Sequence, residues 1–376
     1  MATQSIACPP IAKLLPAVFR NPEIVAGFGV RDWETLIWQA RSAELLGQLR
    51  HCLVEAGKID LAPAKAQGHL NLAWTISERH RQAVHFELQH LATSLARLNC
   101  PVILLKGAAY SAQSLGAAQG RVFNDIDIMV PKERLNQVEQ TLLGAGWIPT
   151  HLNRYDQRYY RRWMHEIPPM EHKSRSTVLD IHHTIIPPTS GIKPDAAAMF
   201  KSALPVATTD ISSFDVLAQE EMVIHSACHL FYGEFQKGLR DLFDLHVLVS
   251  EFSKRDGFWH TLEARAEQMG LGDAVLDALT QCQRIFGTHI DQDTLKHFQE
   301  MHRHPFSGRI RGWIFEQVLR SPHPSASEKW TGFARWLAYA RSHKLRMPLP
   351  LLFYHLSYKA VAPYFKSNAE AVQLKN

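Results

Sequence analysis

The sequence predicts an α+β fold, in which a mixed α/β core of about 100 residues lies between two helical regions. Three observations lead to this fold class. Short apolar runs separated by turn residues occupy residues 99–190, and apolar residues recur every three or four positions on both sides of that stretch. Proline marks both borders, at Cys100-Pro101 and at 187–191. We therefore divide the chain into an N-terminal helical region at 1–98, an α/β core at 99–190 and a C-terminal helical domain at 191–376.

The composition is typical of a globular protein in a reducing compartment. A hydrophobic share of 46% over 376 residues is enough for a sizeable core. No apolar run approaches the ~18 residues of a membrane helix, and the N-terminus lacks the apolar block of a signal peptide, so we expect a cytoplasmic protein. The five cysteines are scattered singly, which favours free thiols over disulfides or zinc sites. The net charge of +5 suits a phosphate-rich ligand, but without a long basic stripe nucleic acid is not expected.

Two amphipathic helices are expected before the core. Asp32 is placed to cap a helix that runs to about residue 56, with Leu36, Leu45 and Leu49 along one face. A second helix is expected over 72–98, because its apolar residues step by three and four.

The core is organised around residues 102–130. An apolar, β-rich run at 102–105 stops at Lys106-Gly107, and a short helix is expected over 108–114. A second strand is expected at 125–130, where acidic and apolar residues alternate.

The remaining elements follow from the period of the apolar residues. Strands are expected at 147–148, 155–170 and 177–186, and helices at 135–142, 214–230, 238–250 and 256–286. The aromatic and basic tail at 328–365 is expected to pack against the helical domain, with contact to a membrane surface as the alternative.

Three aspartates are the candidate catalytic and metal-binding residues. Asp125 and Asp127 lie two positions apart on one predicted strand, so both point to the same side. Asp180 lies on a second alternating strand and shares its face with His182. Neighbouring carboxylates repel unless a cation lies between them, and three of them on adjacent strands can hold two divalent ions ~3.5–4 Å apart. Alternatively, Asp180 caps a turn or pairs with Arg175.

The turn after the first strand is a candidate phosphate site. The amides that follow Gly107 and the start of the next helix can surround a triphosphate, and Lys106 adds a positive charge. A plain strand–helix turn explains the same residues equally well. Arg121 either binds phosphate, which we favour, or pairs with a structural acid.

Several histidines are open to more than one interpretation. His165 and Glu166 either line the site opposite Asp180 or belong to a solvated strand. His225 and His229 lie four apart on a predicted helix, and we interpret them as core or site-wall residues rather than as a metal pair. In the helix that follows, Arg240 and Asp244 have the spacing of a helical ion pair, although either one can instead face a nucleotide.

These residues together resemble a known family. The chain is similar to the bacterial uncharacterised nucleotidyltransferase family, of the DNA polymerase β-like superfamily, over roughly residues 75–250. The resemblance is carried by Leu105-Lys106-Gly107, Arg121, Asp125-Ile126-Asp127, Leu179-Asp180-Ile181-His182, and His225, His229, Leu239-Arg240-Asp241 and Asp244. The superfamily's glycine turn usually reads Gly-Ser or Gly-Gly, and here it reads Lys106-Gly107-Ala108.

The resemblance implies a polymerase β-like core in which Mg²⁺ assists transfer of a nucleoside monophosphate from an NTP. By this resemblance Asp125 and Asp127 bind two Mg²⁺ ions, and Asp180 binds the catalytic ion and helps to deprotonate the acceptor. Lys106, Gly107, Arg121 and His182 are the expected nucleotide-binding residues, and ATP is the default nucleotide. The acceptor is expected to be a hydroxyl of a small molecule or a protein. The alternative is a catalytically weak module of the same fold that binds a nucleotide or a partner protein.

Overall fold

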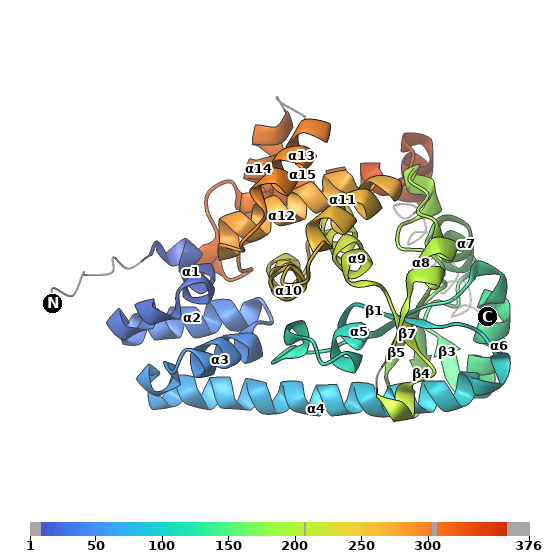
Figure 1. The fold of residues 1–376 in the computed structure, drawn as a ribbon, viewed down its shortest axis with the longest axis horizontal. Coiled ribbons are helices and arrows are strands. Elements are labelled where there is room, and N and C mark those ends of the chain that lie inside the picture. The colour runs from blue at the N-terminus through green and yellow to red at the C-terminus, as the bar shows by residue number, and fades with distance from the viewer. Residues whose placement is uncertain (1–8, 207, 303–306, 359–376) are drawn as a thin grey trace, which may run out of the picture.

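A computed structural model of the chain describes residues 9–206, 208–302 and 307–358. It is a mixed α+β structure in which a seven-stranded sheet lies between helices from both ends of the chain (Figure 1), so the predicted fold class is confirmed. No helix in these ranges is both long and apolar enough to cross a membrane. The four cysteines they contain are free thiols.

Four α-helices lie within residues 9–98, the described part of the N-terminal region. They are α1 (Leu14–Arg20), α2 (Val30–Ser42), α3 (Leu46–Glu55) and α4 (Ala64–Leu95). The single helix expected from Asp32 to about residue 56 is in fact α2 and α3, because Glu44 adopts a left-handed conformation with φ of 57°. Asp32 lies in the first turn of α2, where its Oδ2 accepts a 2.9 Å hydrogen bond from the backbone N–H of Gly29.

Helix α4 connects the N-terminal helices to the sheet. Figure 1 shows it along the lower side of the molecule, passing beneath α2 and α3 and continuing below the strands. Its buried face includes Leu88, Leu91 and Leu95, which belong to the stripe that the sequence predicts. Helix α4 contacts α5 (Lys106–Ala112) and α6 (Leu135–Gly144). The expected start at residue 72 is too late, since α4 begins directly after Pro63.

The sheet brings the predicted acidic strands together. Its order is β3-β4-β5-β2-β1-β7-β6. The strands are β1 (Ile103–Leu105), β2 (Ile126–Met129), β3 (Trp147–Pro149), β4 (Met170–His172), β5 (Val178–His182), β6 (Leu204–Pro205) and β7 (Asp215–Val216). Strand β2 runs antiparallel to β1 and parallel to β5, and in this register Asp127 lies opposite Asp180. The last two strands extend the sheet beyond residue 190, where the predicted core ends.

The prediction of a strand at 155–170 is wrong over most of its length. Residues 154–163 form helix α7 (Arg154–Trp163), and Asn153 caps it by accepting a 2.7 Å hydrogen bond from the Asp156 N–H. The aromatic residues Tyr155, Tyr159 and Trp163 are spaced by four and make ring contacts with one another. That spacing is the period of a helix, whereas the aromatic content of the segment favours a strand.

The C-terminal half is helical, as predicted. Its helices are α8 (Ala196–Ser202), α9 (Gln219–Tyr232), α10 (Gly238–Phe252), α11 (Phe258–Gln268), α12 (Gly272–Phe286), α13 (Gln292–Met301), α14 (Ser307–Val318) and α15 (Thr331–Arg346). Helix α9 lies at the centre and packs against α10, α11, α12 and α15 (Figure 1). The tail helix α15 thus packs on this half, as expected, although aromatic residues such as Phe333 and Trp336 on its outer face stay exposed. The predicted tail beyond residue 358 lies outside the described residues.

Two glycines allow α3 to approach the loop that carries Arg121. Gly120 has a φ of +69°, and a Cβ on Gly47 would overlap the backbone carbonyl of Gly120. Backbone atoms cannot move aside as a flexible side chain can, so this contact requires glycine at residue 47.

We predict that Gly47→Ala destabilises the protein by about 1–3 kcal/mol, because the added methyl group forces α3 away from the loop. The matched control is Gly68→Ala in α4, where nothing lies within 4 Å of the added methyl. That substitution should stabilise the protein by about 0.5–1 kcal/mol through helix propensity. Urea denaturation of both variants measures the difference, and equal stabilities would contradict the close approach.

Candidate active site

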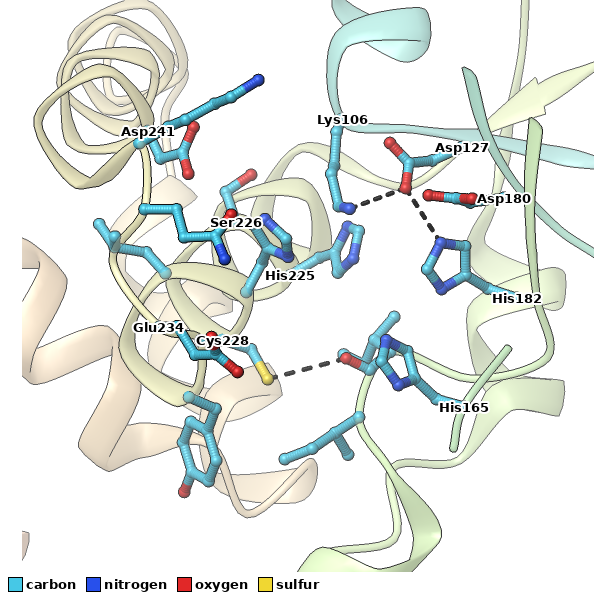
Figure 2. Close-up of a pocket in the computed structure, with 18 of the residues that line it drawn as sticks. Lys106, Asp127, His165, Asp180, His182, His225, Ser226, Cys228, Glu234 and Asp241 are labelled. Carbon is cyan, nitrogen blue, oxygen red and sulfur yellow. Dashed lines mark hydrogen bonds and ion pairs between the residues drawn. The ribbon is translucent and has the colours of Figure 1, made fainter. Parts of the chain in front are cut away.

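A cavity of ≈ 410 Å³ lies between the sheet and helices α9 and α10. Figure 2 shows Lys106, Asp127, Asp180 and His182 on one side of it and residues of α9 and α10 on the other. Six of the seven predicted site residues line this cavity: Lys106, Arg121, Asp125, Asp127, Asp180 and His182. Gly107 is next to the cavity but does not line it.

The three aspartates occupy different depths of the pocket. Asp127 is buried on β2, Asp180 is half-buried opposite it on β5, and Asp125 is exposed just before β2 begins. The parallel pairing of β2 with β5 therefore places two carboxylates at the same level on neighbouring strands. The alternative in which Asp180 pairs with Arg175 is wrong, since Arg175 donates a 2.6 Å hydrogen bond to Glu87.

Asp127 is the centre of a buried polar network (Figure 2). Its Oδ1 accepts hydrogen bonds from Lys106 Nζ at 2.7 Å and from His182 Nε2 at 3.0 Å. Burial alone would raise the pKa of Asp127, but the charge of Lys106 and the bond from His182 outweigh it and hold the pKa well below its ordinary value. Asp127 is therefore a stable carboxylate even without a metal ion.

Asp180 has the opposite environment. Its Oδ1 is buried and has no hydrogen-bond partner among the described residues. Burial, followed by the nearby charges of Asp127 and Glu166, raises its pKa to about 8. Asp125 reaches solvent, but the protein crowded around its carboxyl group, followed by the charge of Asp127, also raises its pKa. Asp180 is thus the aspartate without a cationic partner in the described part of the chain, and a positive charge placed beside it would stabilise its ionised form.

Arg121 is held by a carboxylate in the structure. Its Nε donates to Asp244 Oδ2 at 2.9 Å, and both side chains are buried. A Cβ at residue 107 would lie 2.5 Å from Arg121 Nη1, so Gly107 makes room for this guanidinium. The structure thus shows the pairing of Arg121 with an acid, as a buried guanidinium needs a carboxylate partner, and its phosphate role stays a prediction.

The predicted helical pair of Arg240 with Asp244 is wrong. Arg240 instead donates hydrogen bonds to Glu44 at 2.7 Å and to Asp241 at 2.9 Å. Asp244 is engaged with Arg121 from the other side of the pocket. Glu44 is far from Arg240 in the sequence and Asp241 is its direct neighbour, so helical spacing alone could not identify either partner.

The histidines line the cavity, as the site-wall interpretation predicts. His225 is buried on α9, and His229, one turn later, is exposed towards the pocket. Burial lowers the pKa of His225, and the charge of Lys106 with burial lowers that of His229 to about 4, so both are neutral at pH 7. His165 and Glu166 also line the pocket, and Figure 2 shows His165 opposite α9.

Two further pocket residues were not predicted. Glu234, after α9, and Arg346, at the end of α15, form a 2.6 Å ion pair at the edge of the cavity. No local motif marks either residue, because they meet only through the packing of α15 against α9.

The donor set of the aspartates fits a hard divalent cation such as Mg²⁺. All three residues offer carboxylate oxygens, the ligands that Mg²⁺ prefers, and Asp180 Oδ1 is buried without a partner. Asp127 Oδ1 is bound to Lys106, so binding of a metal ion there requires the ammonium to share or release that oxygen.

The mixed sheet aligns Asp127 and Asp180 on neighbouring strands beneath a helical half, the arrangement that the resemblance to nucleotidyltransferases implies. The chain belongs to the family of uncharacterised nucleotidyltransferases, whose model matches residues 30–287. It is therefore a transferase enzyme by family. No curated protein matches the chain.

We predict opposite stability effects for two neighbouring carboxylates in metal-free protein. The pKa of Asp180 rises on folding from 3.8 to about 8, so the unfolded chain releases this proton first and the stability falls as the pH rises between these values. Asp180→Asn removes that loss and should raise the melting temperature above pH 8, with a smaller gain towards pH 4. Thermal denaturation in EDTA measures both curves.

Asp127→Asn is the contrasting variant. The pKa of Asp127 is lower in the folded protein than its unfolded value of 3.8. The charged carboxylate therefore stabilises the fold above pH 3.8, and this contribution is lost as the pH falls through the depressed folded pKa. The substitution should therefore lower the melting temperature at neutral pH, because Lys106 and His182 lose their carboxylate. A stabilising Asp127→Asn would contradict this assignment.

Proposed function

We propose that the protein transfers a nucleoside monophosphate from an NTP to a hydroxyl of a small molecule or a protein. The observation that carries this proposal is the register of Asp127 opposite Asp180 beside Lys106, in a chain of the nucleotidyltransferase family. ATP is the proposed nucleotide by default, and two Mg²⁺ ions are the proposed cofactors.

In this proposal the aspartates hold the metal ions. Asp125 and Asp127 bind both ions, and Asp180 binds one and orients the acceptor hydroxyl. The bound Mg²⁺ ions supply positive charge to the phosphates and to the attacking oxygen.

Lys106 has a proposed second position. Its ammonium lies on Asp127 Oδ1, and a cation bound by Asp127 would compete for that oxygen. A released Lys106 is close enough to the cavity to contact a phosphate, because it lines the same pocket. The start of α5 (Lys106–Ala112), which no side chain caps, leaves backbone N–H groups beside it.

The size of the pocket supports a small acceptor. A cavity of ≈ 410 Å³ is within the ordinary range of small-molecule sites, about 300–1,000 Å³. Its walls also contain many ionisable groups, so a polar acceptor or a single protein side chain suits it.

A second candidate function is a binding module with little turnover. The observation that favours it is that two of the predicted nucleotide contacts are already paired within the protein, Lys106 with Asp127 and Arg121 with Asp244. If these ion pairs persist with a nucleotide present, the metal ions cannot gain full access to Asp127.

Turnover distinguishes the two functions. We predict that pyrophosphate release from an NTP with Mg²⁺, assayed with an acceptor library, falls by at least about 10²-fold in Asp125→Ala, Asp127→Ala and Asp180→Ala. Asp215→Asn is the matched control, because Asp215 lies on β7 of the same sheet but does not line the cavity.

Near-full activity in any of the three alanine variants would contradict the metal assignment. Nucleotide binding without release of pyrophosphate, for every acceptor tested, would support the binding module instead.

A further inference from the structure

A second group of metal-ligating side chains lies beside the three aspartates. Among the described residues, His165, Glu166 and His182 each offer one ligand atom within 4.8 Å of the others. None of the three aspartates belongs to this group. Figure 2 shows His165 and His182 on the same side of the pocket, across from His225 on α9.

The backbone holds these three residues in place. The segment after α7 pairs with β5 and its continuation, where Ile167 N donates to Ile181 O at 3.0 Å and His183 N donates to His165 O at 2.8 Å. Glu166 thereby forms a bridge with His182. The three side chains consequently come from paired backbone rather than from a free loop, as a preformed metal site requires.

The spacing leaves room for an ion between the ligand atoms. Glu166 Oε2 lies 3.6 Å from His182 Nδ1, and the rings of His165 and His182 have centroids 5.1 Å apart. Ligand atoms at about 2.0–2.2 Å from one ion are separated by roughly 3–4 Å, so small side-chain rotations suffice to close the site. The 3.6 Å separation is longer than a hydrogen bond.

The hydrogen bond to Asp127 prepares His182 as a ligand. A carboxylate only accepts, so His182 Nε2 must carry the proton in the 3.0 Å bond to Asp127. In the neutral ring the lone pair is then on Nδ1, the atom that faces Glu166. Metal-binding histidines are oriented in this way by a carboxylate on their other nitrogen.

Two buried nitrogens support the same conclusion. The Nδ1 atoms of His165 and of His182 are buried and have no hydrogen-bond partner among the described residues. His182 itself is only 2% exposed. Buried polar atoms without partners are rare in folded proteins, and an ion that is not part of the structure is one explanation for them.

We propose that His165, Glu166 and His182 bind one divalent transition-metal ion, such as Zn²⁺ or Mn²⁺. Two imidazoles with one carboxylate favour these ions over Mg²⁺, which prefers oxygen ligands alone. Three protein ligands leave open positions on the ion for water or for a polar group in the pocket. The site is distinct from the aspartate site and does not depend on the proposed transfer reaction, although His182 connects the two through Asp127.

Metal titration of the full chain tests the site directly. After treatment with EDTA and its removal, calorimetry with ZnCl₂ in the presence of excess Mg²⁺ should show one tightly bound Zn²⁺ per chain, and Co²⁺ should give a visible absorption spectrum from nitrogen ligands. His165→Ala and Glu166→Gln should each weaken Zn²⁺ binding by about 10- to 100-fold. Glu166→Gln keeps the shape of the side chain, so it also serves if His165→Ala does not fold.

Two histidine variants are the matched controls. His183→Ala removes the histidine next to His182 that is outside the cluster, and His225→Ala removes a histidine from the opposite wall of the cavity. Both should leave the Zn²⁺ affinity unchanged. The proposal is overturned if wild type binds no stoichiometric ion, or if the controls weaken binding as much as Glu166→Gln does.

The test also separates this site from the aspartate site. Zn²⁺ binding that is lost in Asp125→Ala but kept in Glu166→Gln would overturn the proposal and assign the ion to the aspartates. Mg²⁺-dependent nucleotide binding in Glu166→Gln, measured on the same sample, reports on the proposed function alone, so either proposal can fail without the other.

Discussion

The burial of Asp127 is the constraint on which the rest of the site depends. A carboxylate with 4% of its side chain exposed is stable only if cations or hydrogen bonds replace water. Here Lys106 and His182 provide them, and each comes from a different element: the start of α5 and the end of β5. Lys106 adopts a φ of 45° to do so, a conformation that costs a residue with a side chain some strain. The carboxylate of Asp127 therefore connects β2 with the residue that follows β1 and with the end of β5.

This arrangement gives different pKa values to Asp127 and Asp180, which lie opposite each other on neighbouring strands. Asp127 has a cationic partner and a depressed pKa, whereas Asp180, directly opposite, has a buried oxygen without a partner and a raised pKa. Two similar groups acquire different proton affinities because their surroundings differ, which is the usual way in which proteins separate acid and base roles. The absence of a cationic partner for Asp180 among the described residues supports the proposed metal ions. The His165–Glu166–His182 cluster is a chemically different site, which the His182 ring connects to Asp127.

The parts of the fold that the sequence predicts well are those that local period determines. Strand β1 follows from a short apolar run, β2 and β5, with Asp127 and Asp180, from alternation over a few residues, and α6, α10 and α12 from steps of three and four. Helix α7 is not predicted because its many aromatic residues have strand propensity, although Tyr155, Tyr159 and Trp163 have helical spacing. The partner of Arg121 could not be predicted, because Asp244 is 123 positions away and meets it only when α10 packs over the sheet. The cluster around Glu166 depends in the same way on a backbone pairing outside any named strand.

The central claim is that the aspartates at 125, 127 and 180 form a metal-dependent nucleotide site. Calorimetric titration with ATP, GTP, CTP and UTP, each with and without Mg²⁺, tests it most directly on wild type and on an Asp125→Ala/Asp127→Ala double variant. The account predicts binding that requires Mg²⁺ and disappears in the double variant. Binding of equal strength without Mg²⁺, or in the double variant, would contradict it.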